Sequence, residues 1–520
     1  TGPLAALVAV ALLTSLTAAP RARGAPNVLV IFADDLTCQA ISAYGDSRRL
    51  LETPHIDRLA REGMTFDRCL VTNSICGPSR ATLLTGKYSH TNGFYNNSNC
   101  RFDASQPTFP RSLQAAGWQT ALVGKWHLGS DPVGFDHWQI LPGQGIYYNP
   151  LMRTASGETT ERGYVTDVIT EASVEWLKHR DPDRPFLLMV QHKAPHREWS
   201  PAIRHLGWDG DRVHPEPETL FDDFAGRSRA VADHDMGLER TFTPLDAKFR
   251  APPGIEGDDL VAWNAYYAPR NARFEASAPR GKDLVRWRYQ RYMHDYLGCV
   301  KAIDESVGRL LDELDREGIA EETVVVLSSD QGFFLGEHGW FDKRWIFEES
   351  LRAPLLVRWP GLTRPGSRCG RIVSHLDIAP TFLALARLPE WDGMQGRALQ
   401  PLLAEHADAP WRTSLYYHYY EFPEPHRVRP HRGVITDRYK LVHYEGDLDE
   451  WELLDREVDP LETRTFHDDP AHADTLRELR EELDRLRLEV DDRGDAPREA
   501  YGNAPFPGEA ATAPGSAPGG

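Results

Sequence analysis

Residues 76–86, CGPSRATLLTG, place a cysteine at the start of a short predicted helix. Pro78 suits the first turn of a helix and Gly86 suits its end, so Cys76 should lie at the helix N-terminus. Free backbone N–H groups and the helix dipole favour a negatively charged species there. Arg80, four residues on, should share that face. The alternative is a buried cysteine on a packed helix, which would be favoured for a lone cysteine.

Acidic residues follow two apolar runs that are typical of buried parallel strands. Asp34 and Asp35 follow the run VLVIF, and Asp330 and Gln331 follow TVVVLS. Ligand sites in open α/β sheets gather outside the carboxyl ends of the strands. Adjacent carboxylates repel unless a cation neutralises them, and oxygen ligands suit a hard ion such as Ca²⁺ or Mg²⁺. Loop capping by polar residues is the alternative for either pair taken alone.

Basic residues are predicted at the same edge of the sheet. Each follows a predicted strand or a glycine-rich segment, whereas a lone His or Lys is usually a solvated group. The four principal candidates are Lys125, His127, His196 and Lys343. Three further side chains could extend the pocket: Lys193, His338 and Arg344.

Strands that end at one edge of a sheet would position these residues, and the sequence shows extended and helical patterns in alternation. Short apolar runs recur at residues 120–123, 186–190 and 354–358, and apolar residues at helical spacing span residues 283–317. This alternation predicts an α/β fold, with a large, mixed and mostly parallel sheet flanked by helices. Residues 197–282 are rich in Pro, Asp and Arg, and we expect an irregular insertion there.

The chain is predicted to contain one large and one small domain. Residues 26–405 form the large domain, and residues 406–490 form a smaller C-terminal domain with an antiparallel sheet and a closing helix. Residues 491–520 are rich in Pro, Gly and Ala and are expected to be a disordered tail. Residues 1–25 contain an apolar stretch that we interpret as a signal peptide, truncated at its start.

The composition excludes some function classes. The 520 residues carry a net charge of −18, which argues against broad nucleic-acid binding. No segment after the signal peptide is long and apolar enough to be a membrane span. Because residues 1–25 resemble a signal peptide, we expect a secreted or periplasmic protein. Any anionic substrate must be held by positive charge concentrated in one pocket.

The eleven residues from Cys76 match the signature C-x-P-S-R-x-x-L-L-T-G, and the chain resembles the formylglycine-dependent sulfatases of the alkaline phosphatase superfamily. The resemblance runs from about residue 26 to about residue 485. Its further landmarks are NVLVIFADD at 27–35, TPHID at 53–57, GKWHLG at 124–129, KAPH at 193–196, SDQG at 329–332, GEHG at 336–339, LDIAPTF at 376–382 and QGR at 395–397.

The resemblance implies a sulfuric ester hydrolase with an alkaline phosphatase-like fold. Cys76 would be oxidised to formylglycine (3-oxoalanine) by a separate formylglycine-generating or sulfatase-maturating enzyme. An oxygen of residue 76 would then bind one divalent cation, Ca²⁺ or Mg²⁺, together with Asp34, Asp35, Asp330 and Gln331. By the same resemblance, Arg80, Lys125 and Lys343 stabilise the sulfuryl oxygens, His196 protonates the leaving oxygen and His127 accepts a proton during sulfate release.

Residues 330–343 and 347–350 look most like glycan sulfatases acting on 6-O-sulfated N-acetylglucosamine. Iduronate-2-sulfatases and arylsulfatases stay open as alternatives, as do a phosphate or phosphonate monoester hydrolase on the same fold and an inactive glycan-binding protein. Sugar-binding candidates are His418, His431 and Arg432 in the second domain. Aromatic packing in a core is the competing interpretation of that region.

Overall fold

A mixed sheet of eleven strands forms the centre of the molecule in this computed structural model, which describes residues 24–406, 408–423, 425–494 and 496–501. Strand β1 (Asn27–Ala33) lies in the middle and is parallel to both its neighbours, β7 (Phe186–Gln191) and β8 (Thr323–Ser329). Beyond β7, β3 (Gln119–Lys125) continues the parallel part. Beyond β8, β11 (Arg352–Arg358) is antiparallel.

The full order of the sheet is β12-β2-β11-β8-β1-β7-β3-β4-β5-β6, with β13 also beside β2. The outer strands are β2 (Met64–Leu70), β4 (His137–Leu141), β5 (Leu151–Thr154), β6 (Gly157–Thr160), β12 (Ser367–Cys369) and β13 (Val373–Ser374). A separate pair, β9 (Phe334–Leu335) and β10 (Phe341–Asp342), is antiparallel.

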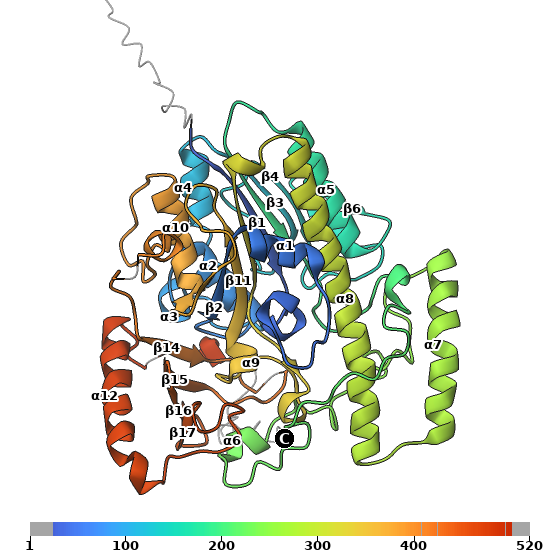
Figure 1. Cartoon of the computed structure of the whole chain (residues 1–520), viewed down its shortest axis with the longest axis vertical. Helices are drawn as coiled ribbons and strands as arrows, with labels where there is room; N and C mark the ends of the chain where they lie inside the picture. Colours follow the sequence, from blue (N-terminus) through green and yellow to red (C-terminus); the bar gives the residue numbers. More distant parts are fainter. Residues whose placement is uncertain (1–23, 407, 424, 495, 502–520) are drawn as a thin grey trace, which may run out of the picture.

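Alternate residues of β1 enter two different cores, because successive side chains of a strand point to opposite faces of the sheet. Leu29 and Ile31 pack with one core, whereas Val30 and Phe32 pack with the other. Helices cover both faces, as Figure 1 shows. One face carries α1 (Pro54–Glu62), α5 (Val165–His179) and α8 (Lys282–Arg316), and the other carries α2 (Cys76–Thr85), α4 (Phe109–Ala115) and α10 (Ile378–Leu385).

A smaller antiparallel sheet of four strands follows in sequence, in the order β14-β15-β16-β17. Helix α12 (Ala473–Glu489) packs on it and shares its apolar core (Figure 1). The strands are β14 (Ser414–Tyr419), β15 (His431–Thr436), β16 (Tyr439–Tyr444) and β17 (Glu450–Asp455). Shorter helices are α3 (Ser89–Asn92), α6 (Arg229–Ala232), α9 (Glu348–Leu351) and α11 (Gln400–Leu403). Together the two sheets confirm the predicted fold class.

The segment expected to be irregular, residues 197–282, contains the helix α7 (Gly257–Ser277). The prediction missed this helix because it buries little of its surface. Only Trp263 and Tyr267 of its residues are buried, so an apolar stripe is nearly absent from its sequence, and Pro269 lies inside it.

The predicted disordered tail, residues 491–520, is wrong over its first part. Asp492 is buried and its carboxylate lies 2.8 Å from Nδ1 of His418, and Ala500 is fully buried. The rest of that prediction, residues 502–520, lies outside the described residues, as does the expected signal peptide up to residue 23. No described helix has a stretch long and apolar enough to cross a membrane. All six cysteines are free.

Candidate active site

The carboxyl ends of four neighbouring strands meet at one edge of the large sheet. Ala33 of β1 is in register with Ser329 of β8, so the acids that follow these strands are brought side by side. In the same way Gln191 of β7 is in register with Gly124 of β3, the residue before Lys125. Ligand sites of α/β sheets occupy this edge because several strands deliver their following loops to one place.

Cys76 is the first residue of α2 and is 1% exposed. The next residue, Gly77, donates its N–H to Oδ1 of Asn97 at 3.0 Å. A Cβ at Gly77 would lie 2.4 Å from Cε1 of Phe94, so only glycine allows this close approach. Ser79, one turn into the helix, lies 2.9 Å from Nδ1 of His375. The N-terminus of α2 is thereby anchored with residue 76 facing the strand ends.

Arg80 connects α2 to all four strand ends. Its Nη2 donates to Oδ2 of Asp330 at 2.9 Å, and its Nη1 donates to Oε1 of Gln191 at 2.6 Å and to the carbonyl of Lys125 at 3.0 Å. Nη2 also lies 3.6 Å from Oδ1 of Asp34. Because Arg80 is 3% exposed, these charge-assisted contacts are shielded from water and hold the helix and sheet in one arrangement.

Two buried lysines pair with the acids that follow β1. Nζ of Lys343 lies 2.7 and 2.8 Å from the two carboxylate oxygens of Asp35, and Nζ of Lys125 contacts Asp34. Burial raises the pKa of Asp35 to about 8 and that of Asp330 to about 6, with repulsion from Asp34 contributing to both. Burial opposes ionisation of Asp34 as well, but Lys125 prevails and the pKa of Asp34 stays well below its usual range.

The oxygen atoms at this edge fit a hard divalent cation. Carboxylate oxygens of Asp34, Asp35 and Asp330 all lie within 4.8 Å of one another. Oδ1 of Asp34 and Oε1 of Gln331 are buried and have no hydrogen-bond partner among the described residues. The amide nitrogen of Gln331 faces Asp35 and Asp330. Rotating the amide group by half a turn would place its oxygen, Oε1, where the nitrogen now lies. Three acids and an amide oxygen form a donor set suited to Ca²⁺ or Mg²⁺.

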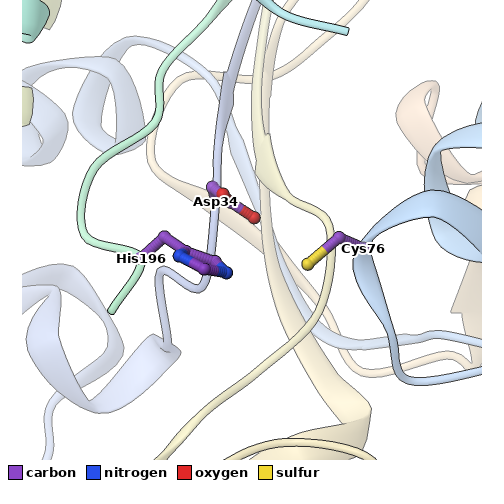
Figure 2. Close-up of side chains that lie close together, drawn as sticks. All are labelled: Asp34, Cys76 and His196. Carbon is purple, nitrogen blue, oxygen red and sulfur yellow. The ribbon is translucent and has the colours of Figure 1, made fainter. Parts of the chain in front are cut away.

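Two histidines approach the acids from other loops. Figure 2 shows His196 and Cys76 on opposite sides of Asp34, and one potential ligand atom from each of the three lies within 4.8 Å of the others. Nδ1 of His196 lies 2.7 Å from the carbonyl of Arg197, so Nδ1 donates and Nε2 can exchange a proton. Burial and nearby lysines keep the pKa of His196 and His127 well below the ordinary value. Nδ1 of His127 is buried without a described partner.

A cavity of about 610 Å³ opens from Cys76 and Lys343 to the surface. Beside Lys343, Asp342 and Arg344 line it, and both have positive φ values, 82° and 89°. Oδ1 of Asp342 accepts from Nη1 of Arg344 at 2.5 Å, and its Oδ2 lies 2.9 Å from Nε2 of His426. Non-glycine residues at positive φ are strained and gather at functional sites. The side chains of Asp342, Arg344 and His426 therefore form a rigid polar wall of the cavity, next to Lys343.

Comparison with known proteins identifies the family. Residues 26–388 match the family described as Sulfatase, which is more than half of the chain. The chain belongs to the sulfatase family. Residues 336–489 also match the family described as N-sulphoglucosamine sulphohydrolase, C-terminal. The protein is thus a sulfuric ester hydrolase, and sulfatases in general use a formylglycine and a divalent metal ion, which agrees with the cysteine and the oxygen cluster described above.

Similar proteins include glycan sulfatases. The sulfatase is 42% identical over 498 residues to an N-acetylglucosamine-6-O-sulfatase of Bacteroides thetaiotaomicron, which covers 91% of this chain and 88% of the relative. It is 26% identical over 424 residues to human N-acetylglucosamine-6-sulfatase, covering 76% of this chain and 67% of the relative.

Solved structures agree with the fold. One solved structure is a complex of a protein with its substrate, D-glucosamine-2-N,6-O-disulfate. It matches with a TM-score of 0.87 and 43% identity and covers 90% of this chain and 98% of the other. A phosphonate monoester hydrolase from Silicibacter pomeroyi has a TM-score of 0.69 at 20% identity, covering 91% and 97% of the two chains. The latter likeness shows the fold alone.

The structure places the expected sugar-binding residues of this sulfatase away from the cavity at Cys76. His431 is fully buried and packs between the rings of Trp345 and Tyr417, at centroid distances of 5.3 and 5.5 Å. His418 is 2% exposed and pairs with Asp492. Neither lines the cavity at Cys76, and neither does Arg432, which pairs with Glu445. The structure does not bring these sugar-binding candidates to the cavity at Cys76, because they lie on β14 and β15 inside the smaller domain.

Two other candidates do not line the cavity at Cys76 itself. His338 is 2% exposed, and its Nδ1 lies 2.7 Å from Asp222, outside the cavity at Cys76. Lys193 lines an adjacent cavity of about 540 Å³ that shares His196 with the first. Its Nζ lies 4.9 Å from the ring centroid of Tyr147, and burial together with Lys125 lowers the pKa of Lys193 to about 8.

Several lining residues had no clear signal in the sequence. Asn97, Gln144, Arg240 and His426 line the cavity but follow no recognisable strand or motif, whereas Arg197 directly follows the KAPH segment at 193–196. The exceptions are Asp342 and Arg344, because they flank Lys343 in the sequence.

Proposed function

We propose that this sulfatase removes the 6-O-sulfate from N-acetylglucosamine or N-sulfated glucosamine at the end of a sulfated glycan. The observation that carries the proposal is the 42% identity to an N-acetylglucosamine-6-O-sulfatase across nearly the whole of both chains. A cavity of about 610 Å³ with a buried cysteine in its lining suits one terminal sugar better than the middle of a chain.

Asp34, Asp35, Asp330 and Gln331 are the proposed ligands of the divalent cation, which is Ca²⁺ or Mg²⁺. Residue 76, as formylglycine, is the proposed site of the nucleophile. The bound ion and the formylglycine would together supply an activated oxygen nucleophile near neutral pH. We expect a formylglycine-generating or sulfatase-maturating enzyme as the partner that modifies Cys76, and we expect export, since residues 4–16 form an apolar signal-like stretch.

Three buried cations are proposed to hold the sulfate group. Arg80, Lys125 and Lys343 surround the acids beside Cys76, and their positive charges would stabilise negative charge on the sulfuryl oxygens during transfer. A low-dielectric, fixed arrangement makes such stabilisation strong because the groups need not reorganise during the reaction.

His196 and His127 are the proposed proton carriers. The carbonyl of Arg197 fixes the His196 ring, so Nε2 points toward Asp35 at 3.9 Å. Burial disfavours the imidazolium form of His196 and the Asp34 carboxylate favours it; in that form Nε2 carries the proton that would pass to the leaving alcohol. Burial and Lys125 hold the pKa of His127 well below its usual value, and a neutral imidazole can accept a proton during sulfate release.

Asp342, Arg344 and His426 are proposed to bind the sugar hydroxyls in place of His418, His431 and Arg432. The three line the cavity, carry both donors and acceptors, and are already oriented by their mutual contacts. A sugar that leaves the polar groups of such a site without partners has a kcat/KM lower by up to about 10⁴-fold.

A substrate panel tests the proposal. Purified enzyme with modified residue 76 is incubated with 6-sulfated N-acetylglucosamine, 2-sulfated iduronic acid, an aryl sulfate and an aryl phosphonate. We expect the largest kcat/KM for the 6-sulfated sugar. A larger value for the 2-sulfated uronic acid would move the substrate assignment to that sugar, and a larger value for the phosphonate would contradict the proposed reaction.

A further inference from the structure

The hairpin of α7 and α8 holds a second cavity, separate from the one at Cys76. Its volume is about 420 Å³, and it lies between α7, the first turns of α8 and a loop at residues 209–213. None of its lining residues also lines the cavity at Cys76. Figure 1 shows α7 beside the lower half of α8, on the side of the molecule away from the smaller sheet.

Positive charge exceeds negative charge on the wall of this cavity, although the whole chain has a net charge of −18. Four arginines and two aspartates line it. Both acids are already paired: Asp211 lies 2.5 Å from Arg270, and Asp209 lies 2.8 Å from His294. Three arginines form no ion pair with a carboxylate in the part of the chain that the structure describes, namely Arg212, Arg273 and Arg291.

Arg291 is the most informative of these residues. It is 8% exposed, and its Nη1 is buried without a hydrogen-bond acceptor among the described residues. Its guanidinium lies 5.0 Å from the ring centroid of Tyr267 and 5.2 Å from that of Trp287. A buried guanidinium without a counter-charge raises the free energy of the folded protein. An anion bound in the cavity would supply that counter-charge, and its binding would be favoured for this reason.

Aromatic and apolar side chains supply the rest of the wall. Trp287 forms a cluster with Phe274, whose ring is tilted to it at a centroid distance of 4.1 Å, and with Phe249, whose ring is stacked on it at 5.8 Å. Val213 on the opposite loop is 78% exposed, and Phe249 beside the cavity is 38% exposed. An inorganic anion would use only the arginines. A ligand that combines negative groups with apolar ring faces would use both kinds of wall.

We propose that the hairpin cavity is a second, non-catalytic binding site for an oligosaccharide that carries sulfate or carboxylate groups. Planar guanidinium groups bind both oxoanions through paired hydrogen bonds, and the aromatic rings pack against sugar faces. The choice of a glycan among organic anions rests on the proposed function.

Direct binding tests the proposal without turnover. In a Cys76→Ala background, a highly sulfated hexasaccharide and its desulfated counterpart are titrated by calorimetry. We expect Arg273→Ala and Arg291→Gln each to raise the Kd of the sulfated hexasaccharide about tenfold, which corresponds to about 1.4 kcal/mol. Arg280→Ala is the matched control, because Arg280 is an exposed arginine of the same hairpin that does not line the cavity.

Hydrogen exchange localises the effect. The sulfated hexasaccharide should protect α7 amides, and Arg273→Ala should abolish that protection. In enzyme that keeps Cys76, Arg273→Ala should leave kcat/KM for 6-sulfated N-acetylglucosamine within about twofold of the unsubstituted enzyme. An unchanged Kd in both arginine variants, or an equal rise in Arg280→Ala, would overturn the proposal. Equal binding of the desulfated hexasaccharide would overturn it too. Because binding needs no catalysis, failure here is distinguishable from failure of the proposed 6-O-sulfatase activity.

Discussion

The Asp342→Asn substitution gives the sharpest test of the proposed sugar-binding role of Asp342, Arg344 and His426. Asp342 contacts both other residues of this group. Its Oδ1 accepts hydrogen bonds from Arg344 at 2.5 Å and from the backbone N–H of Lys343 at 2.8 Å, and its Oδ2 lies 2.9 Å from Nε2 of His426. Asparagine has the same shape, and it tolerates the positive φ of 82° at this position better than most residues. The substitution therefore removes charge with little change in the backbone.

The expected magnitude follows from the loss of one charge-assisted hydrogen bond to a sugar hydroxyl. Such a bond contributes about 1.5–3 kcal/mol. At about 1.4 kcal/mol for each factor of ten, kcat/KM for 6-sulfated N-acetylglucosamine should fall about 10- to 150-fold. An aryl sulfate does not fill the sugar site, so its kcat/KM should change by less than about threefold. Glu421, 3.8 Å from Nη2 of Arg344, partly replaces the lost counter-charge and limits the loss of stability.

The assay compares the two substrates on folded enzyme, with Tm measured for each variant. Asp447→Asn is the matched control, because Asp447 also pairs with an arginine, Arg429, but does not line the cavity. Its substitution should leave the ratio of the two activities unchanged. Equal losses on sugar sulfate and aryl sulfate in Asp342→Asn would refute the reasoning, since they would assign Asp342 to the positioning of Lys343 in the sulfate pocket.

Four further outcomes are expected. Cys76→Ala should reduce turnover by at least about 10³-fold with little change in Tm, since it removes the proposed nucleophile site; normal turnover would contradict the formylglycine assignment. Asp34→Ala should lose both bound metal, measured by elemental analysis, and activity, and full metal occupancy in this variant would disprove the ligand set. His431→Ala should cost about 3–5 kcal/mol of stability, as for a buried aromatic side chain, and should affect sugar and aryl sulfates equally; a selective loss on the sugar would restore His431 to the sugar site. Although burial opposes it, hydrogen bonds from His418 and Tyr416 hold the pKa of Asp492 well below its usual range, so this carboxylate contributes stability that is present above about pH 4 and is lost as the pH falls. The Tm difference between the unsubstituted protein and Asp492→Asn should therefore shrink from about pH 6 to about pH 3, and a constant difference would contradict the role of that charge.

Much of the candidate active site could be predicted from the sequence because its residues follow regular elements. Asp34 and Asp330 come after continuous apolar runs, and parallel strands bring their carboxyl ends to one edge of a sheet. Cys76 precedes a proline in a short helical pattern, and the structure starts α2 at that residue. In these cases local pattern and chain direction suffice to place a side chain, because the geometry of a parallel sheet leaves few alternatives.

Only the tertiary structure decided which polar residues of the smaller domain and the loops face the cavity. His431 lies on β15, and its neighbours Trp345 and Tyr417 come from distant segments that no local pattern connects to it. His426, in a loop five residues earlier, reaches Asp342 instead. Likewise α7 was missed because it buries only two side chains. A strand residue points to a core or to a cavity according to which elements pack on each face, and that packing is set by contacts far apart in the sequence.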